Sequence, residues 1–298
     1  MKILLLGKNG QVGWELQRSL APLGEVLALD RNSTAYCGDL SQPDQLAQTV
    51  LAFKPDIIVN AAAHTAVDKA ESEPELAKVL NVDAPATLAK AAAQVDAWLI
   101  HYSTDYVFDG SGTHARQEGE GTGPLSVYGQ TKLDGEKAIV SSGCKYLIFR
   151  TSWVYAARGG NFAKTMLRLA QERERLTVIN DQHGAPTGAD LIADVTAHAI
   201  RRVLNTQNVA FGGVYHLVAS GETTWHGYAQ HVIEQAKHIK PELSWKVQSI
   251  APVPTSAFPT PAARPHNSRL CTTKLQERFG LVLPPWKQGV DRMLAEIL

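Results

Sequence analysis

Five short apolar segments in the first 150 residues constrain the fold of this chain more than any other feature. They are KILLL (2–6), EVLAL (25–29), DIIVN (56–60), AWLIH (97–101) and KYLIF (145–149). Each is short and apolar on both faces, which is typical of strands buried inside a parallel sheet. Longer helical patterns, such as residues 84–94 and 126–141, separate them. These repeated strand–helix–strand units predict an α/β fold with a Rossmann-type, doubly wound parallel sheet.

A change of pattern after about residue 152 predicts a second, smaller domain. With 298 residues, the chain is near the size at which a single hydrophobic core stops growing. We therefore expect one domain at 1–152 and a smaller one made mainly of 153–298, with parts of about 174–220 returning to the first. The segment APVPTSAFPTPAARP (251–265) contains five prolines, so it cannot form a helix or a central strand. We expect an ordered loop over a ligand cleft there, with a disordered linker as the alternative.

The composition excludes several classes of partner. Lys plus Arg and Asp plus Glu both number 29, so no excess positive charge attracts nucleic acid or an acidic membrane. No apolar run approaches the ~18 residues of a membrane span, and the run in MKILLLG is too short for a signal peptide. The three cysteines, Cys37, Cys144 and Cys271, have neither the spacing of a zinc site nor that of a disulfide framework. We therefore expect a cytoplasmic protein with reduced thiols.

A glycine turn follows the first apolar segment directly. GKNGQVG places Gly7, Gly10 and Gly13 at the spacing G-x-x-G-x-x-G, and a helix is expected to begin at about Gln11. Glycines at these points allow a tight turn, close approach of the backbone to a diphosphate, and close packing of helix on strand. The free N–H groups of the helix amino terminus would face the anion. The sequence therefore predicts a dinucleotide-binding site at this turn.

Two residues at the end of the second segment bear on which dinucleotide is bound. Asp30 ends this segment, where a carboxylate can accept hydrogen bonds from the adenosine ribose. Arg31 follows, and its guanidinium could instead bind a 2′-phosphate. Asp30 favours NADH and Arg31 permits NADPH, so we expect both coenzymes to be usable and leave the preference open.

A tyrosine and a lysine stand four residues apart in PLSVYGQTK, on one face of the helix expected at 126–141. This spacing alone is common in amphipathic helices. Beside a nicotinamide, however, the Tyr128 phenol could give a proton to a ketone oxygen, while the Lys132 ammonium brings the phenol pKa nearer to neutrality. The hydroxyls of Ser103 and Thr104 follow the fourth segment, where one could stabilise the substrate oxygen. We predict a proton-transfer site at this sheet edge.

Together, the glycine turn, Thr104, Tyr128 and Lys132 resemble the extended short-chain dehydrogenase/reductases. The resemblance implies an NAD(P)-binding Rossmann domain at 1–152 and a domain for a sugar nucleotide in 153–298. Further motifs are similar to reductases of dTDP-linked keto sugars: NAAAHTAVDKAE, STDYVFDG, YGQTKLDGE, RTSWVYA, DQHGAPTGA and RPHNSRL. The resemblance runs from Gly7 to Leu270 or beyond. It implies that NADH or NADPH reduces the C4 ketone of dTDP-6-deoxy-L-lyxo-4-hexulose to dTDP-L-rhamnose, the final step in making this precursor of lipopolysaccharide O-antigen and other cell-surface polysaccharide.

The same resemblance implies roles for individual residues. Tyr128 would donate the proton, Lys132 would tune it and bind the ribose, and Thr104 would hydrogen-bond the reacting oxygen. The substrate would contact Thr104, Asp105, Tyr128 and Trp153. The cofactor would contact Gly7, Gly10, Gln11, Val12, Gly13, Asp30, Arg31, Asp39, Leu40, Ala62, Ala63, His64, Thr65, Tyr102, Tyr128 and Lys132. The family is also associated with Mg²⁺ and with homodimers, but the sequence does not place a metal.

Other functions compete with this interpretation. A dehydratase of the same superfamily would carry a glutamate where this chain has Tyr106. A reductase of another dTDP-4-keto-6-deoxy sugar would share the motifs given above. A non-catalytic, NADP-binding regulatory subunit would share the fold, although the intact Thr104, Tyr128 and Lys132 favour an enzyme.

Overall fold

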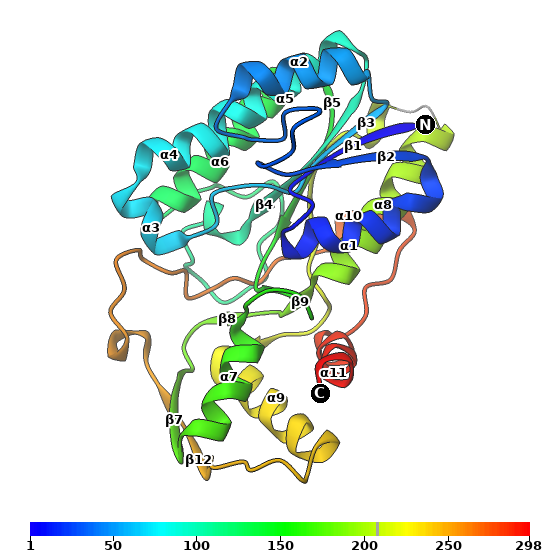
Figure 1. The fold of residues 1–298 in the computed structure, drawn as a ribbon. Helices are drawn as coiled ribbons and strands as arrows, with labels where there is room; N and C mark the ends of the chain where they lie inside the picture. Colours follow the sequence, from blue (N-terminus) through cyan, green and yellow to red (C-terminus); the bar gives the residue numbers. More distant parts are fainter. Residues whose placement is uncertain (207–208) are drawn as a thin grey trace.

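The computed structural model describes residues 1–206 and 209–298 (Figure 1). Six parallel strands form the central sheet in the order β10-β5-β4-β3-β1-β2. The strands are β1 (Lys2–Leu6), β2 (Glu25–Leu29), β3 (Ile57–Asn60), β4 (Trp98–Thr104), β5 (Lys145–Thr151) and β10 (Gly213–His216). The chain winds to one side of β1 through β2 and to the other through β3, as in doubly wound sheets. The predicted Rossmann-type α/β fold is confirmed.

Alternate side chains of each strand enter two separate cores. Ile3 and Leu5 pack with helices on one face, whereas Leu4 and Leu6 pack with helices on the other, and all four are fully buried. The first face is covered by α1 (Gln11–Leu20), α8 (Ala189–Thr206) and α10 (Thr273–Phe279), and the second by α2 (Pro43–Phe53), α5 (Ala84–Gln94) and α6 (Val127–Ser141). Burial on both sides explains why the strand sequences show no polar alternation.

Short helices line the path between β3 and α5. They are α3 (Val67–Ser72), α4 (Pro74–Lys78) and a π-helical turn, η2 (Val79–Asp83). Three further short turns are η1 (Ala21–Leu23), η3 (Asp105–Val107) and η4 (Val209–Phe211). The turn η3 follows β4 directly, so it lies at the edge of the sheet where a ligand is expected.

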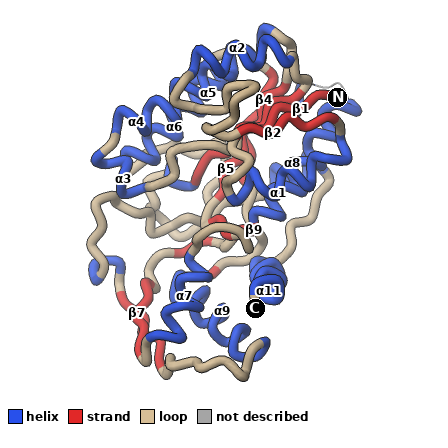
Figure 2. The backbone as a smooth tube through the Cα atoms, in the orientation of Figure 1, coloured by secondary structure: helices blue, strands red, loops and turns tan. Residues whose placement is uncertain are grey.

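A second group of elements lies beyond the carboxyl ends of the strands (Figures 1 and 2). Helices α7 (Phe162–Glu172), α9 (Trp225–Ile239) and α11 (Trp286–Ile297) share a third core with the paired strands β7 (Arg175–Ile179) and β12 (Ser249–Val253). Two smaller strand pairs are β6 (Val154–Tyr155) with β9 (Thr187–Gly188), and β8 (His183–Gly184) with β11 (Thr223–Thr224). We call this group the lower lobe.

The proline-rich segment 251–265 begins inside a strand. Its first three residues belong to β12, which pairs only with β7 among the described elements. A proline fits an edge strand because the side away from the partner needs no N–H donor. The 3-10 turn η5 (Thr255–Ala257) follows, and the rest is irregular. In the two described ranges, no helix is both long and apolar enough to span a lipid bilayer.

Candidate active site

A cavity of about 600 Å³ lies where β1, β3, β4 and β5 end, and we call it the sheet-edge cavity. Most of the predicted site residues line it. They are Gly7, Gly10, Gln11, Val12, Ala62, Ala63, Thr65, Tyr102, Thr104, Asp105, Tyr128, Lys132 and Trp153. Segments far apart in sequence therefore meet at one site, because the carboxyl ends of parallel strands share one edge.

The glycine turn after β1 has no room for larger residues. Gly7 has a φ of +86°, and a Cβ there would lie 2.8 Å from the Ala62 nitrogen. A Cβ on Gly13 would lie 2.0 Å from the Gly7 oxygen, so α1 packs directly on the turn. Gly10 supplies no side-chain cap, and the first turn of α1 carries no acidic residue. The uncapped N–H groups beside Gln11 and the cavity fit the diphosphate of a dinucleotide.

Local packing brings the predicted proton donor to the end of β4. The Ser126 hydroxyl accepts a hydrogen bond from the Gly129 nitrogen (3.1 Å) and caps α6. A Cβ on Gly129 would lie 2.3 Å from the Tyr106 oxygen, so glycine lets α6 pack against the turn after β4. Tyr128, in the first turn of α6, thereby lies beside Thr104.

Thr104 and Asp105 are buried, and the partly buried Tyr128 lies beside them. The Thr104 hydroxyl donates to Asp105 Oδ1 (3.0 Å) and accepts from the Tyr106 nitrogen (3.2 Å). Burial raises the pKa of Tyr128 to about 12, although a hydrogen bond with Thr104 acts in the opposite direction. Burial likewise raises the pKa of Asp105 to about 6, against the effect of hydrogen bonds with Ser268 and Thr104. The phenol therefore holds its proton at neutral pH.

Lys132 is buried at the base of the cavity and faces β4. Its Nζ donates to the Tyr102 carbonyl oxygen (2.6 Å) and lies 3.1 Å from His101 Nε2. Burial lowers the pKa of Lys132 to about 8, while the charge of Glu136 opposes this change. The structure does not show the expected lowering of the Tyr128 pKa by Lys132. Desolvation has the largest effect on the pKa of Tyr128. The Lys132 ammonium points instead to the Tyr102 carbonyl oxygen of β4.

Three buried hydroxyl groups in the cavity have no protein partner. Ser103 Oγ, Thr151 Oγ1 and Ser152 Oγ make no hydrogen bond with any residue of the described ranges. All three residues line the sheet-edge cavity. Buried polar atoms without partners are rare, so these hydroxyls fit a polar ligand such as a ribose or a sugar.

Six predicted cofactor residues do not line this cavity. They are Gly13, Asp30, Arg31, Asp39, Leu40 and His64. Gly13 acts through helix packing, and Leu40 is buried in the core between β2 and α2. The Asp30 carboxylate accepts from the Asn32 nitrogen (3.0 Å) and the Ser33 hydroxyl (3.1 Å), at the end of β2. The cofactor roles of these six residues stay predictions.

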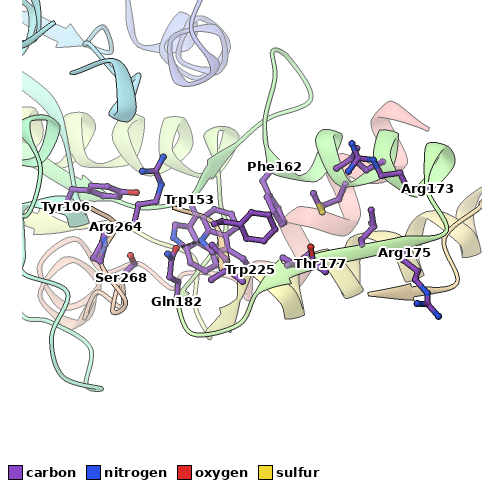
Figure 3. A pocket seen from close by; sticks show the side chains of 17 residues that line it. Tyr106, Trp153, Phe162, Arg173, Arg175, Thr177, Gln182, Trp225, Arg264 and Ser268 are labelled. Carbon is purple, nitrogen blue, oxygen red and sulfur yellow. Dashed lines mark hydrogen bonds between the residues drawn. The ribbon is translucent and has the colours of Figure 1, made fainter. Parts of the chain in front are cut away.

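A second cavity, of about 440 Å³, extends into the lower lobe, and we call it the lobe cavity. Figure 3 shows Trp153, Phe162 and Trp225 grouped along it, with Tyr106 at one end and Arg175 toward the other. The rings of Trp153 and Trp225 stack with centroids 3.8 Å apart. Tyr106, Trp153 and Trp225 line both cavities, so the two cavities adjoin at these rings.

The backbone around Trp153 is arranged to present its ring. Trp153 has a φ of +49°, which side-chain-bearing residues rarely adopt. A Cβ on Gly184 would lie 2.9 Å from the indole, so the glycine of DQHGAPTGA leaves space for it. Sequence reasoning identified Trp153 but missed Tyr106 and Trp225 as lining residues. Tyr106 lies within the STDYVFDG motif and could have been found, whereas nothing in the sequence around Trp225 indicated a site.

The carboxylates of the chain do not fit the Mg²⁺ that the resemblance implied. Within 1–206 and 209–298, no three His, Cys, Asp or Glu side chains gather as metal ligands would. A smaller cavity of about 240 Å³ is lined by Glu15, Asp190 and Glu296. However, Asp190 accepts from Arg292 (3.0 Å) and Glu15 pairs with Arg18 (3.5 Å). Arginines already pair with two of these three carboxylates.

Comparison with known proteins agrees with this geometry. The profile of the family described as RmlD substrate binding domain matches residues 1–298. The dTDP-4-dehydrorhamnose reductase of Escherichia coli (strain K12) is 62% identical over 297 residues, which cover 100% of this chain and 98% of that protein.

Two solved structures are also similar along the whole chain. The dTDP-4-dehydrorhamnose reductase from Clostridium acetobutylicum has a TM-score of 0.88 and 34% identity, covering 100% of this chain and 99% of that one. The one from Bacillus anthracis, solved in complex with NADP, has a TM-score of 0.87 and 34% identity, covering 99% of each chain. The chain belongs to the RmlD substrate-binding domain family, the family of the dTDP-4-dehydrorhamnose reductases.

Proposed function

We propose that this chain reduces the C4 ketone of dTDP-4-dehydrorhamnose, also named dTDP-6-deoxy-L-lyxo-4-hexulose, to give dTDP-L-rhamnose. Its coenzyme is NADPH or NADH; the Bacillus anthracis relative was solved with NADP. The observation that carries the proposal is the position of Tyr128. This residue lies beside Thr104 in the sheet-edge cavity. Its ring packs edge to face on the ring of Tyr106, with centroids 5.5 Å apart. Tyr106 lines both cavities. A keto sugar at this junction is within reach of a proton donor.

When bound, the dihydronicotinamide supplies a hydride to C4 of the sugar. Tyr128 donates its proton to the ketone oxygen, and its raised pKa keeps that proton in place until the oxygen gains charge. In the structure the Thr104 hydroxyl donates its hydrogen to Asp105. To hydrogen-bond the sugar oxygen as a donor, Thr104 must turn that hydrogen away from Asp105. We assign Lys132 the role of stabilising the phenolate that forms, through its positive charge.

We place the dTDP portion of the substrate in the lobe cavity. Trp153, Phe162 and Trp225 offer flat apolar surfaces for a base or a deoxysugar. Arg173 and Arg175 also line this cavity and could meet the diphosphate. Arg264 lines it too, but it is already paired with Asp68 (2.8 Å). This placement supports the proposed division, in which 1–152 binds the coenzyme and 153–298 mainly binds the sugar nucleotide.

We further propose that the chain forms a cytoplasmic homodimer. The support is the family resemblance, together with three cysteines that are all free thiols in the structure. Sedimentation velocity should give twice the mass of one chain, and a monomer at micromolar concentration would contradict the dimer. Metal removal by a chelator should leave turnover unchanged, since the described residues offer no cluster of ligands.

Purified protein, each coenzyme and dTDP-4-dehydrorhamnose test the proposed activity. We expect loss of NADPH absorbance and formation of dTDP-L-rhamnose, identified by NMR of the product. A higher kcat/KM with another dTDP-4-keto-6-deoxy sugar would favour the alternative reductase. A protein that binds NADPH but consumes none with any of these sugars would favour the regulatory subunit.

A further inference from the structure

A buried row of polar groups leads from Lys132 across two strands to the wall of the sheet-edge cavity. Lys132 Nζ lies 3.1 Å from His101 Nε2, and His101 Nδ1 lies 3.3 Å from Asn60 Nδ2. Asn60 Oδ1 accepts from the Ala62 nitrogen (3.2 Å). Lys132, His101 and Asn60 are each at most 2% exposed, so their hydrogen bonds to one another are shielded from bulk solvent. Asn60 and Ala62 both line the sheet-edge cavity.

The imidazole of His101 carries a single hydrogen. Its pKa lies well below the usual value because burial and the nearby Lys132 charge both disfavour imidazolium. One ring nitrogen therefore donates and the other accepts. Lys132 Nζ also donates to the Tyr102 carbonyl oxygen, which can only accept. Which ring nitrogen holds the hydrogen thus depends on whether Lys132 is an amine or an ammonium.

With a neutral amine at Lys132, every contact in the row is satisfied. His101 Nε2–H donates to Nζ, Asn60 Nδ2 donates to His101 Nδ1, and the Ala62 N–H donates to Asn60 Oδ1. With an ammonium, Nζ must donate to Nε2, and the ring hydrogen moves to Nδ1. Nδ1–H then needs an acceptor, which only the amide oxygen of Asn60 can provide in this row. The side-chain amide of Asn60 must therefore flip, so that its oxygen faces His101 Nδ1. The Ala62 N–H then loses Asn60 Oδ1 as its acceptor.

Hydrogen bonds to an ionised group are stronger than those between neutral groups, so the ammonium imposes the second arrangement. We propose that His101 couples the proton on Lys132 to the Ala62 N–H at the cofactor site, through its tautomer and the side-chain amide of Asn60. His101 is thus a positioning residue that acts through Lys132. In the ammonium form, the Ala62 N–H is free to donate to a bound coenzyme. The inference rests on the role proposed above for Lys132.

The charged and titratable groups around Lys132 are few and come from three elements. Glu136, on α6, is ion-paired with Arg150 on β5 (2.7 Å), and both side chains are buried. Tyr128 lies one turn before Lys132 on α6, and Asp105 follows β4. Tyr128 loses its proton only at higher pH than Lys132, and Asp105 titrates at lower pH. A change observed near pH 8 therefore reports Lys132.

The direct test follows the ring nitrogens of His101 by ¹⁵N NMR in the full-length protein, without any substrate. We expect the hydrogen on Nδ1 below about pH 8 and on Nε2 above it, with the resonance assigned by its loss in His101→Gln. In Lys132→Met, which keeps the apolar stem and removes Nζ, the hydrogen should stay on Nε2 throughout. A ring that does not change tautomer in the wild type, or that changes equally in Lys132→Met, would overturn the coupling.

A second test uses the pH dependence of kcat. His101→Phe removes the acceptor that stabilises the ammonium, so the alkaline limb should move to lower pH and kcat at pH 8 should fall roughly tenfold. His101→Gln keeps an acceptor near Nζ, so its alkaline limb should lie close to the wild-type position. Ile100→Val is the matched control. Ile100 precedes His101 on β4, and its side chain lies in the core that the sheet shares with α1 and α8. An alkaline limb that is the same in His101→Phe as in the wild type would overturn the proposal.

The two tests separate failure of this inference from failure of the proposed function. If no dTDP-4-keto sugar is reduced, the proposed function is wrong, yet the NMR titration still decides the coupling. If His101→Phe does not fold, as shown by circular dichroism, the wild type and Lys132→Met still give a result.

Discussion

Trp153 and Trp225 stack with their planes 18° apart and their centroids separated by 3.8 Å, at the point where the two cavities adjoin. Trp153 follows β5 and Trp225 begins α9, so the contact joins the sheet to the lower lobe. Phe162 also packs against this pair, and the centroid of its ring lies 4.7 Å from that of Trp225. An apolar face of a 6-deoxy sugar can pack on such a surface.

Trp225→Ala should raise the KM for the sugar nucleotide by roughly tenfold or more, because an aromatic surface at the centre of the site is lost. The Kd of NADPH should change much less, since the glycine turn lies between β1 and α1 and Trp225 belongs to the lower lobe. Steady-state kinetics and NADPH fluorescence titration measure the two values. Trp245→Ala, a tryptophan of the lower lobe that lines neither cavity, is the control. An unaltered KM for the sugar would remove Trp225 from the substrate site.

Tyr128→Phe should lower kcat at least a hundredfold, because loss of a general acid typically removes a factor of about 10²–10⁴. The ring and its edge-to-face contact with Tyr106 persist, so the Kd of NADPH should be nearly constant. Single-turnover measurements with saturating coenzyme report the chemical step. Tyr146→Phe removes a hydroxyl from β5 and should have no effect on kcat. Turnover that survives in Tyr128→Phe would mean that another group supplies the proton.

Asp30→Ala should weaken the binding of NADH by roughly tenfold, the value expected when hydrogen bonds to a carboxylate are lost. The binding of NADPH should weaken less. The carboxylate is already oriented by the Asn32 nitrogen, the Ser33 hydroxyl and the side chain of Asn9. Arg31→Ala should instead weaken the binding of NADPH more than that of NADH, since it removes the charge expected to bind the 2′-phosphate. Kd values for both coenzymes in both variants give the comparison. Equal losses for NADH and NADPH would place these side chains away from the ribose.

Asp105→Asn should stabilise the protein at pH 8 and not at pH 4. The pKa of Asp105 is raised to about 6 by burial, above its unfolded value, so the folded state binds this proton more tightly. Ionisation therefore costs stability above pH 6, on the order of 2–3 kcal/mol, and the cost vanishes below about pH 4. Urea unfolding of wild type and variant at the two pH values measures it.

Asp109→Asn is the matched control for this titration. Hydrogen bonds from Ser111 lower the pKa of the exposed Asp109 carboxyl, so its ionised form stabilises the fold at pH 8. Its replacement should therefore destabilise, and the loss should diminish as the pH falls below the usual Asp range. The same sign for both variants would show that the burial argument for Asp105 is wrong.

Glu136→Gln should destabilise the fold by about 3–5 kcal/mol, the usual result of breaking a buried ion pair. Glu136 binds Arg150 through both carboxylate oxygens, and this pair ties the helix that carries Tyr128 to β5. Asp134→Asn breaks the exposed pair with Lys137 on the same helix and should cost less than about 1 kcal/mol. Denaturant titration compares the two. A similar small loss in both variants would mean that the buried pair adds little.

The sheet could be predicted from the sequence because its signal is local. Burial on both faces leaves a continuous apolar run, and β1 and β2 have the bounds that their runs suggested. Strands β4 and β5 run on to Thr104 and Thr151, beyond their predicted ends. Polar residues at these ends line the sheet-edge cavity, so they carry no hydrophobic signal.

The lower lobe and the final set of contacts at the site were harder to predict. Trp225 reaches the cavity only because α9 packs on α7, and this contact depends on tertiary structure. The direction of Lys132 toward the Tyr102 carbonyl could not be read from the Tyr-x-x-x-Lys spacing either. The spacing fixes which residues share a helix face, but a neighbouring strand decides which partner the ammonium meets.

The last strand of the six-stranded sheet, β10, comes from residues 213–216, after both α7 and α8. During synthesis β5 must therefore stay an unpaired edge while more than sixty further residues leave the ribosome. A nascent chain arrested before β10 would expose this edge, and it should be more prone to aggregate than one arrested just after it.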